Sequence, residues 1–133
     1  MDIKKLMVGD LVHHQGTYVR VYGTEYVSNE ETGFYNAVHG ITLNDYEPIC
    51  IHPSFLKPLS LTEALLKLNG WKILDSDDKN VFWKEDSTNF IVSSWCDFFY
   101  RDEIPIRYVH EFQHILRLCG YANLADNFKV FIK

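Results

Sequence analysis

The sequence predicts an α+β protein in which a small β module (residues 1–56) packs on an α-β-β-β-α unit (residues 57–133). Two patterns predict this arrangement. Short apolar and aromatic segments broken by glycine fill the first part, and a helical period begins near Leu61. The chain has 133 residues, 47% hydrophobic and 15% aromatic, which is enough for one compact globular unit or two very small subdomains sharing a core.

The first part is predicted to contain short strands joined by tight turns. Val19 and Val21 alternate with Arg20, as in a half-buried strand, and Gln15-Gly16 is typical of a hairpin turn. Further apolar segments follow over residues 34–41 and 47–55. Several short strands that open on a "GDLV" turn resemble SH3-like barrels.

The second part is predicted as a helix, an antiparallel meander and a second helix. Ser60 and Thr62 are both suitable N-caps for the first helix, and Asn69-Gly70 is a typical helix end. Residues 71–106 read as three strands, with Pro105 at the start of the second helix. Residues 121–133 are expected to add a turn and a short final strand.

Residues 110–114, "HEFQH", match the HExxH spelling of zinc peptidases. On a helix His110 and His114 would lie on one face as zinc ligands, with Glu111 as general base. A catalytic zinc needs a third protein ligand, and Asp126 is the only carboxylate after His114. A minimal zinc metallohydrolase is therefore an alternative interpretation.

The favoured interpretation is an ordinary amphipathic helix. At about 100° per residue, an apolar stripe falls on one side of it, and His110 and His114 fall on the other side with Gln113 and Arg117. This pattern predicts that both histidines face solvent. No cofactor or metal is expected.

The segment "WCDFFYRDE" suggests a surface for a partner. Adjacent residues of a strand point to opposite faces, so Phe98 and Phe99 cannot both face one core. We expect one of the two rings to lie at the surface or under another chain, as a contact for a protein partner or for self-association.

Charge and composition bear on other classes of function. The net charge of −5, without any run of Lys or Arg, argues against nucleic-acid binding, although an SH3-like nucleic-acid-binding module is a second alternative. No apolar run is long enough for a membrane span or a signal peptide, which predicts a cytoplasmic protein. Cys50, Cys96 and Cys119 have no metal-site spacing and are expected to be buried, reduced thiols.

Three motifs carry a resemblance to a family. The opening "VGDLV", the middle "PLSLTEALLKLNGW" and the end "YVHEFQHILRLCG" are similar to small uncharacterised proteins of Bacteroidetes bacteria and of their phages and mobile elements. The family patterns look like "IGNLV", "PIPLTEEWLLKFGF" and "YVHQLQNLYFALTG". Glu111 stands where the family has Gln, and His114 where it has Asn, so the resemblance implies that HExxH is private to this chain.

The resemblance implies no known activity. No complete catalytic motif is present either. We therefore expect a non-enzymatic binding or accessory protein of mobile-element type that contacts other proteins through aromatic residues.

Overall fold

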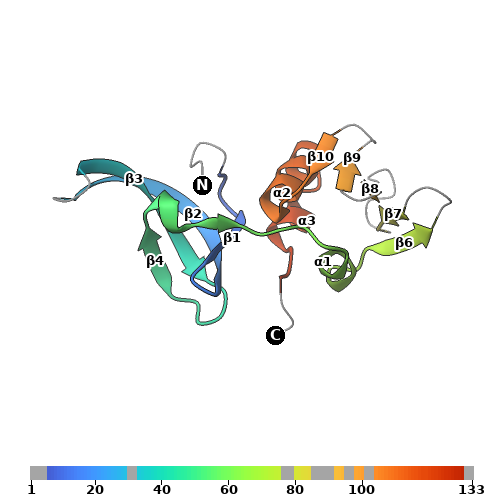
Figure 1. Cartoon of the computed structure of the whole chain (residues 1–133), viewed down its shortest axis with the longest axis horizontal. Coiled ribbons are helices and arrows are strands. Elements are labelled where there is room, and N and C mark those ends of the chain that lie inside the picture. Colours follow the sequence, from blue (N-terminus) through green and yellow to red (C-terminus); the bar gives the residue numbers. More distant parts are fainter. Residues whose placement is uncertain are drawn as a thin grey trace. The chain divides into compact units, whose positions relative to one another are not determined.

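The computed structural model describes residues 6–29, 33–75, 80–84, 92–94, 98–100 and 104–130. The fold is mixed α+β, as the sequence predicts (Figure 1). The chain divides into two compact units, Met1–Leu59 and Ser60–Lys133, which are called here the N-terminal and the C-terminal unit.

The N-terminal unit is an antiparallel sheet with strand order β4-β3-β2-β1-β5. Its elements are β1 (Leu11–His14), β2 (Thr17–Asn29), β3 (Gly33–Thr42), β4 (Pro48–Ile51), the 3-10 turn η2 (Pro53–Phe55) and β5 (Lys57–Pro58). Neighbouring strands along the chain pair with one another, and β5 returns to pair with β1.

The hairpin between β1 and β2 follows the sequence prediction. Gln15 and Gly16 both have positive φ, at 46° and 82°, and His14 pairs with Thr17 across the turn. Two successive residues with positive φ form the two-residue turn whose twist fits antiparallel strands.

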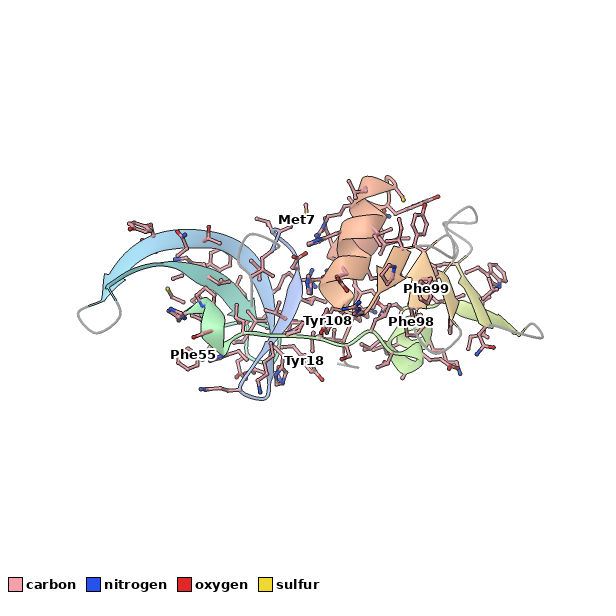
Figure 2. All side chains as sticks on the ribbon, turned by 45° about the horizontal axis from the view of Figure 1, so that its top comes forward. Met7, Tyr18, Phe55, Phe98, Phe99 and Tyr108 are labelled. Carbon is pink, nitrogen blue, oxygen red and sulfur yellow. The ribbon has the colours of Figure 1, made fainter. Side chains whose placement is uncertain are left out.

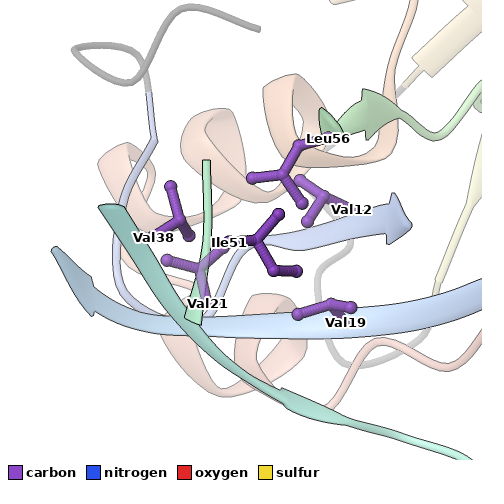
Figure 3. Close-up of a cluster of buried hydrophobic side chains, with 6 residues drawn as sticks. All are labelled: Val12, Val19, Val21, Val38, Ile51 and Leu56. Carbon is purple, nitrogen blue, oxygen red and sulfur yellow. The ribbon is translucent and has the colours of Figure 1, made fainter. Parts of the chain in front are cut away.

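The core of the N-terminal unit consists of aliphatic side chains from β1 to β4 and from the residue before β5, which gather in one cluster (Figure 3). They are Val12, Val19, Val21, Val38, Ile51 and Leu56. Gly40 allows β2 and β3 to approach closely here, since a Cβ at this position would overlap Cγ1 of Val19 and would lie 3.1 Å from the Arg20 carbonyl oxygen. The predicted alternation of Val19 and Val21 is thus confirmed.

The C-terminal unit contains the predicted antiparallel meander, with strand order β10-β9-β8-β7-β6. The meander has five short strands where the sequence predicted three: β6 (Lys72–Asp75), β7 (Asn80–Trp83), β8 (Val92–Ser94), β9 (Phe98–Tyr100) and β10 (Ile104–Ile106). Pro105 lies inside β10 and not at the helix start. An edge strand tolerates proline because its outer side needs no N–H donor.

Three helices complete the C-terminal unit: α1 (Glu63–Leu68), α2 (Val109–Leu118) and α3 (Ala122–Asp126). Thr62 is the N-cap of α1, and its hydroxyl accepts the Leu65 N–H at 3.2 Å. Asn69 and Gly70, the latter with φ of 85°, end the helix as predicted. The sequence prediction missed α3 and placed only a turn there; the last residues of the expected final strand, 131–133, lie outside the described residues.

Aromatic rings form the core of the C-terminal unit. Phe112 of α2 is fully buried, and its ring lies 5.4 Å from the Trp71 ring and 5.7 Å from the Phe128 ring. Phe82 and Leu66 are also buried. Trp71, between α1 and β6, and Phe128, after α3, therefore pack on the same side chain of α2.

Prolines occupy three of the four edge strands of the two described sheets. Pro48 lies in β4, Pro58 in β5 and Pro105 in β10. Proline has no N–H to donate, so these strands offer an incomplete edge for pairing with another strand.

Two further expectations concern membranes and thiols. Among the described residues no helix has the length and apolar character needed to span a bilayer.

Cys50 and Cys119 are free thiols, but both are exposed, so the expectation that they are buried is wrong. Cys96 lies outside the described residues.

Candidate functional site

The HExxH residues lie on α2, but not on a solvated face. His110 is buried, with 7% of its surface exposed, and Gln113 is fully buried. The prediction that both histidines face solvent is therefore wrong for His110, and Gln113, which was assigned to the same face, is buried as well. Helix α3 explains the error for Gln113, whose Nε2 donates to the Ala125 carbonyl oxygen at 2.9 Å. His114 is half-buried.

His110 packs between two aromatic neighbours. Its ring stacks on Tyr108, with centroids 5.8 Å apart and planes inclined by 7°. The His114 ring meets it edge-on at 5.6 Å. The two imidazoles are therefore close, as the i, i+4 spacing requires. Together with Tyr108 they form a row of three packed rings along α2.

Glu111 caps the helix. Its Oε1 accepts the backbone N–H groups of Arg107, at 2.9 Å, and Tyr108, at 3.1 Å, so the carboxylate satisfies donors that the first turn leaves unpaired. Asp126, the only carboxylate downstream, lies 3.5 Å from Nη2 of Arg117. Within the described ranges no three His, Cys, Asp or Glu side chains gather as a metal site.

Phe98 and Phe99 are successive residues of β9, and both are half-buried (Figure 2). The Phe98 ring packs on Phe82 with centroids 5.6 Å apart. Phe99 pairs in register with Pro105 of β10. Neither ring is among the strongly exposed apolar side chains of the described residues, which directs attention to another surface.

That surface is on the N-terminal unit and is called here the outer-face cluster: Tyr22, Glu25, His39, Ile41 and Cys50. His39 pairs in register with Cys50, and Ile41 follows two residues later on the same face of β3. Nε2 of His39 lies 2.6 Å from Oε2 of Glu25 and 4.0 Å from Sγ of Cys50. The Tyr22 ring lies 5.7 Å from the His39 ring.

The cluster is open to solvent. Tyr22 is 45% exposed and Ile41 is 38% exposed. Sequence reasoning missed it because the strand alternation was used to find the core, although the same alternation assigns the opposite face to Arg20, His39 and Ile41.

The arrangement of His39 does not suit nucleophilic catalysis. A Cys-His-acid relay uses one imidazole nitrogen for the nucleophile and the other for the acid. Here Glu25 and Cys50 both approach Nε2. The cluster combines an aromatic ring, an aliphatic side chain and a hydrogen-bonded His–Glu pair, which is the composition of a contact surface.

Most of the other exposed large apolar side chains of the described residues also lie in the N-terminal unit. Within the described residues, the N-terminal unit also exposes Met7, Val8, Tyr26, Tyr46 and Phe55, whereas the C-terminal unit exposes Ile104 and Leu118. Among the described residues, the exposed apolar surface that could contact a partner therefore lies mainly in the N-terminal unit.

No protein-family model, curated protein or solved structure matches this chain. The resemblance to small Bacteroidetes and phage proteins therefore stays a prediction, and the function has to be argued from geometry.

Proposed function

We propose that the protein is a non-enzymatic binding protein whose outer-face cluster contacts another protein. One observation carries the proposal: Tyr22 and Ile41 are 45% and 38% exposed beside the His39–Glu25 pair on the adjacent strands β2 and β3. Tyrosine is enriched among the residues that dominate binding energy at interfaces.

Energetic reasoning supports this assignment. Fully burying a large apolar side chain contributes about 1.5–3 kcal/mol, and covering the exposed part of Tyr22 and of Ile41 contributes a corresponding share of it to a binding free energy. Oε2 of Glu25 lies 2.6 Å from Nε2 of His39, so this side of the cluster is polar. An apolar centre with polar groups around it is the common organisation of an interface.

The architecture is compatible with a binding module. We propose that the N-terminal unit is SH3-like, and two features support this: the strand order β4-β3-β2-β1-β5 and the 3-10 turn η2 directly before β5. The accessory role in a mobile element rests on the sequence resemblance. The free, exposed thiols of Cys50 and Cys119 support a reducing compartment such as the cytoplasm.

The two alternatives receive less support. Glu111, the base of a zinc hydrolase, is engaged in capping α2. A nucleic-acid module needs cations, but acidic residues outnumber basic ones in the N-terminal unit. The basic residues are Lys4, Lys5, Arg20 and Lys57, and the acidic ones are Asp2, Asp10, Glu25, Glu30, Glu31, Asp45 and Glu47.

Affinity capture from the native host with matched baits tests the proposal. The baits are the wild type, a Tyr22→Ser/Ile41→Ser double variant and a Tyr46→Ser control, because Tyr46 is 67% exposed but lies outside the cluster. We expect a protein that the wild type and the control retain and the double variant loses. Sedimentation of the same three proteins identifies the case in which the partner is a second copy. Identical behaviour of all three baits contradicts the proposal.

A further inference from the structure

A separate cavity lies in the C-terminal unit, with a volume of about 200 Å³. Residues from the end of α1, from the strands and from the segment around α3 line it: Leu68, Asn69, Trp71, Lys84, Leu124, Asn127, Phe128 and Lys129. Trp71 and Phe128 are almost fully buried, at 4% and 2% exposed, so they form a firm apolar wall.

Asn69 holds two sides of the cavity together. Its Oδ1 accepts the Lys129 N–H at 2.6 Å, and its Nδ2 lies 2.8 Å from both the Lys129 and the Leu65 carbonyl oxygens. The two bonds between Asn69 and Lys129 connect residues 60 positions apart in the sequence. The cavity is therefore preformed, which lowers the ordering cost of binding.

Two lysines, Lys84 and Lys129, line the cavity. Nζ of Lys84 donates to the Asn69 carbonyl oxygen at 2.7 Å, which fixes its position and leaves two of its three N–H donors for other acceptors. Among the ion pairs of the described residues, none involves Lys84 or Lys129. In a chain with a net charge of −5, this combination of two cations and an apolar wall favours an anionic ligand with an apolar body.

We propose that this cavity binds a small organic acid, with the apolar part against Trp71 and Phe128 and the carboxylate at Lys84 and Lys129. A volume of about 200 Å³ corresponds to about seven water molecules, so the ligand has roughly seven to ten non-hydrogen atoms. Such a ligand is expected to bind with a Kd of about 1 mM. The site is distinct from the outer-face cluster and does not depend on the proposed protein partner.

Titration with three probes tests the chemistry. Phenylacetate carries both the ring and the charge, phenylacetamide carries only the ring, and inorganic phosphate carries only charge. Tryptophan fluorescence and the indole NMR signal of Trp71 report binding. We expect saturable binding of phenylacetate and at least tenfold weaker binding of the other two. Equal affinity for phenylacetate and phenylacetamide, equal affinity for phosphate, or no binding of phenylacetate overturns the proposal.

Variants test the location. Lys84→Met is expected to weaken phenylacetate binding about tenfold, and Leu124→Trp is expected to abolish it by filling the cavity. Lys67→Met is the matched control, because Lys67 pairs with Glu63 on α1 and does not line the cavity. Should Lys84→Met fail to fold, Lys129→Met serves in its place, with the same expected loss. Equal effects of the cavity and control substitutions contradict the site.

Discussion

The two units of the chain use aromatic residues in opposite ways. The N-terminal unit is built on valine, isoleucine and leucine, and it leaves Tyr22, Tyr26, Tyr46 and Phe55 exposed. Among the described residues of the C-terminal unit, five rings are buried: Trp71, Phe82, Tyr100, Phe112 and Phe128. A small, closely paired sheet has room for little more than β-branched side chains inside, whereas a helix packed over other elements can enclose large rings.

The contrast indicates which aromatic residues stabilise the fold and which are available for binding. Rings that are enclosed contribute to folding, and rings that stay in water are available to a partner. Aromatic content by itself therefore does not locate a binding surface. We expect substitutions of the enclosed rings to change the free energy of unfolding, and substitutions of the exposed rings to change association.

The largest expected effect concerns the aromatic core. Phe112→Ala should lower the free energy of unfolding by about 3–5 kcal/mol, because the ring is fully buried against Trp71 and Phe128. Urea unfolding followed by circular dichroism measures the loss. The control is Leu118→Ala on the same helix, which is 87% exposed and should cost less than about 0.5 kcal/mol. Similar losses in both variants would contradict the assignment of this core.

A smaller effect is expected from tight packing in the N-terminal sheet. Gly40→Ala should cost about 1–3 kcal/mol, since its Cβ would overlap Cγ1 of Val19. Gly23→Ala in the paired strand should stay within about 0.5 kcal/mol, because a Cβ there meets no atom within 4 Å. If thermal unfolding shows the two alanine variants to be equally stable, the close approach of β2 and β3 is wrong.

The smallest effect separates the hydrogen bonds of Glu111 from its charge in capping α2. Glu111→Ala should cost about 1 kcal/mol, because two backbone N–H groups lose their acceptor. Glu111→Gln should cost less than about 0.5 kcal/mol, since an amide oxygen also accepts these bonds. Chemical denaturation compares the two variants. A loss from glutamine as large as that from alanine would show that the charge, and not the capping geometry, is what the helix requires.

Much of the fold was predictable from local signals. Thr62, Asn69 and Gly70 delimit α1 because caps act within a few residues, and Gln15-Gly16 specifies its hairpin for the same reason. The number of strands in the meander was not predictable. Strands of three or four residues are too short to show a period, and Pro105 was read as a helix start although an edge strand accepts it.

The candidate sites were predicted less well, because the environment of a helix face depends on distant segments. The period of α2 correctly placed Phe112 inside, but it assigned Gln113 to water because α3 had not been foreseen. Adjacency in β9 predicted that Phe98 or Phe99 lies at the surface or under another chain; both are half-buried, and the contact with a partner stays a prediction. The outer-face cluster depends on the register of three strands, which no single segment reveals.

The prolines of β4, β5 and β10 have a consequence for how this protein meets others. A chain that joins a sheet by backbone hydrogen bonds is recognised almost regardless of its sequence, and the same openness permits fibril growth. With Pro48, Pro58 and Pro105 in these strands, three edges discourage such pairing. At these three edges recognition depends on side chains, whereas β6, the remaining edge strand of the two described sheets, has no proline.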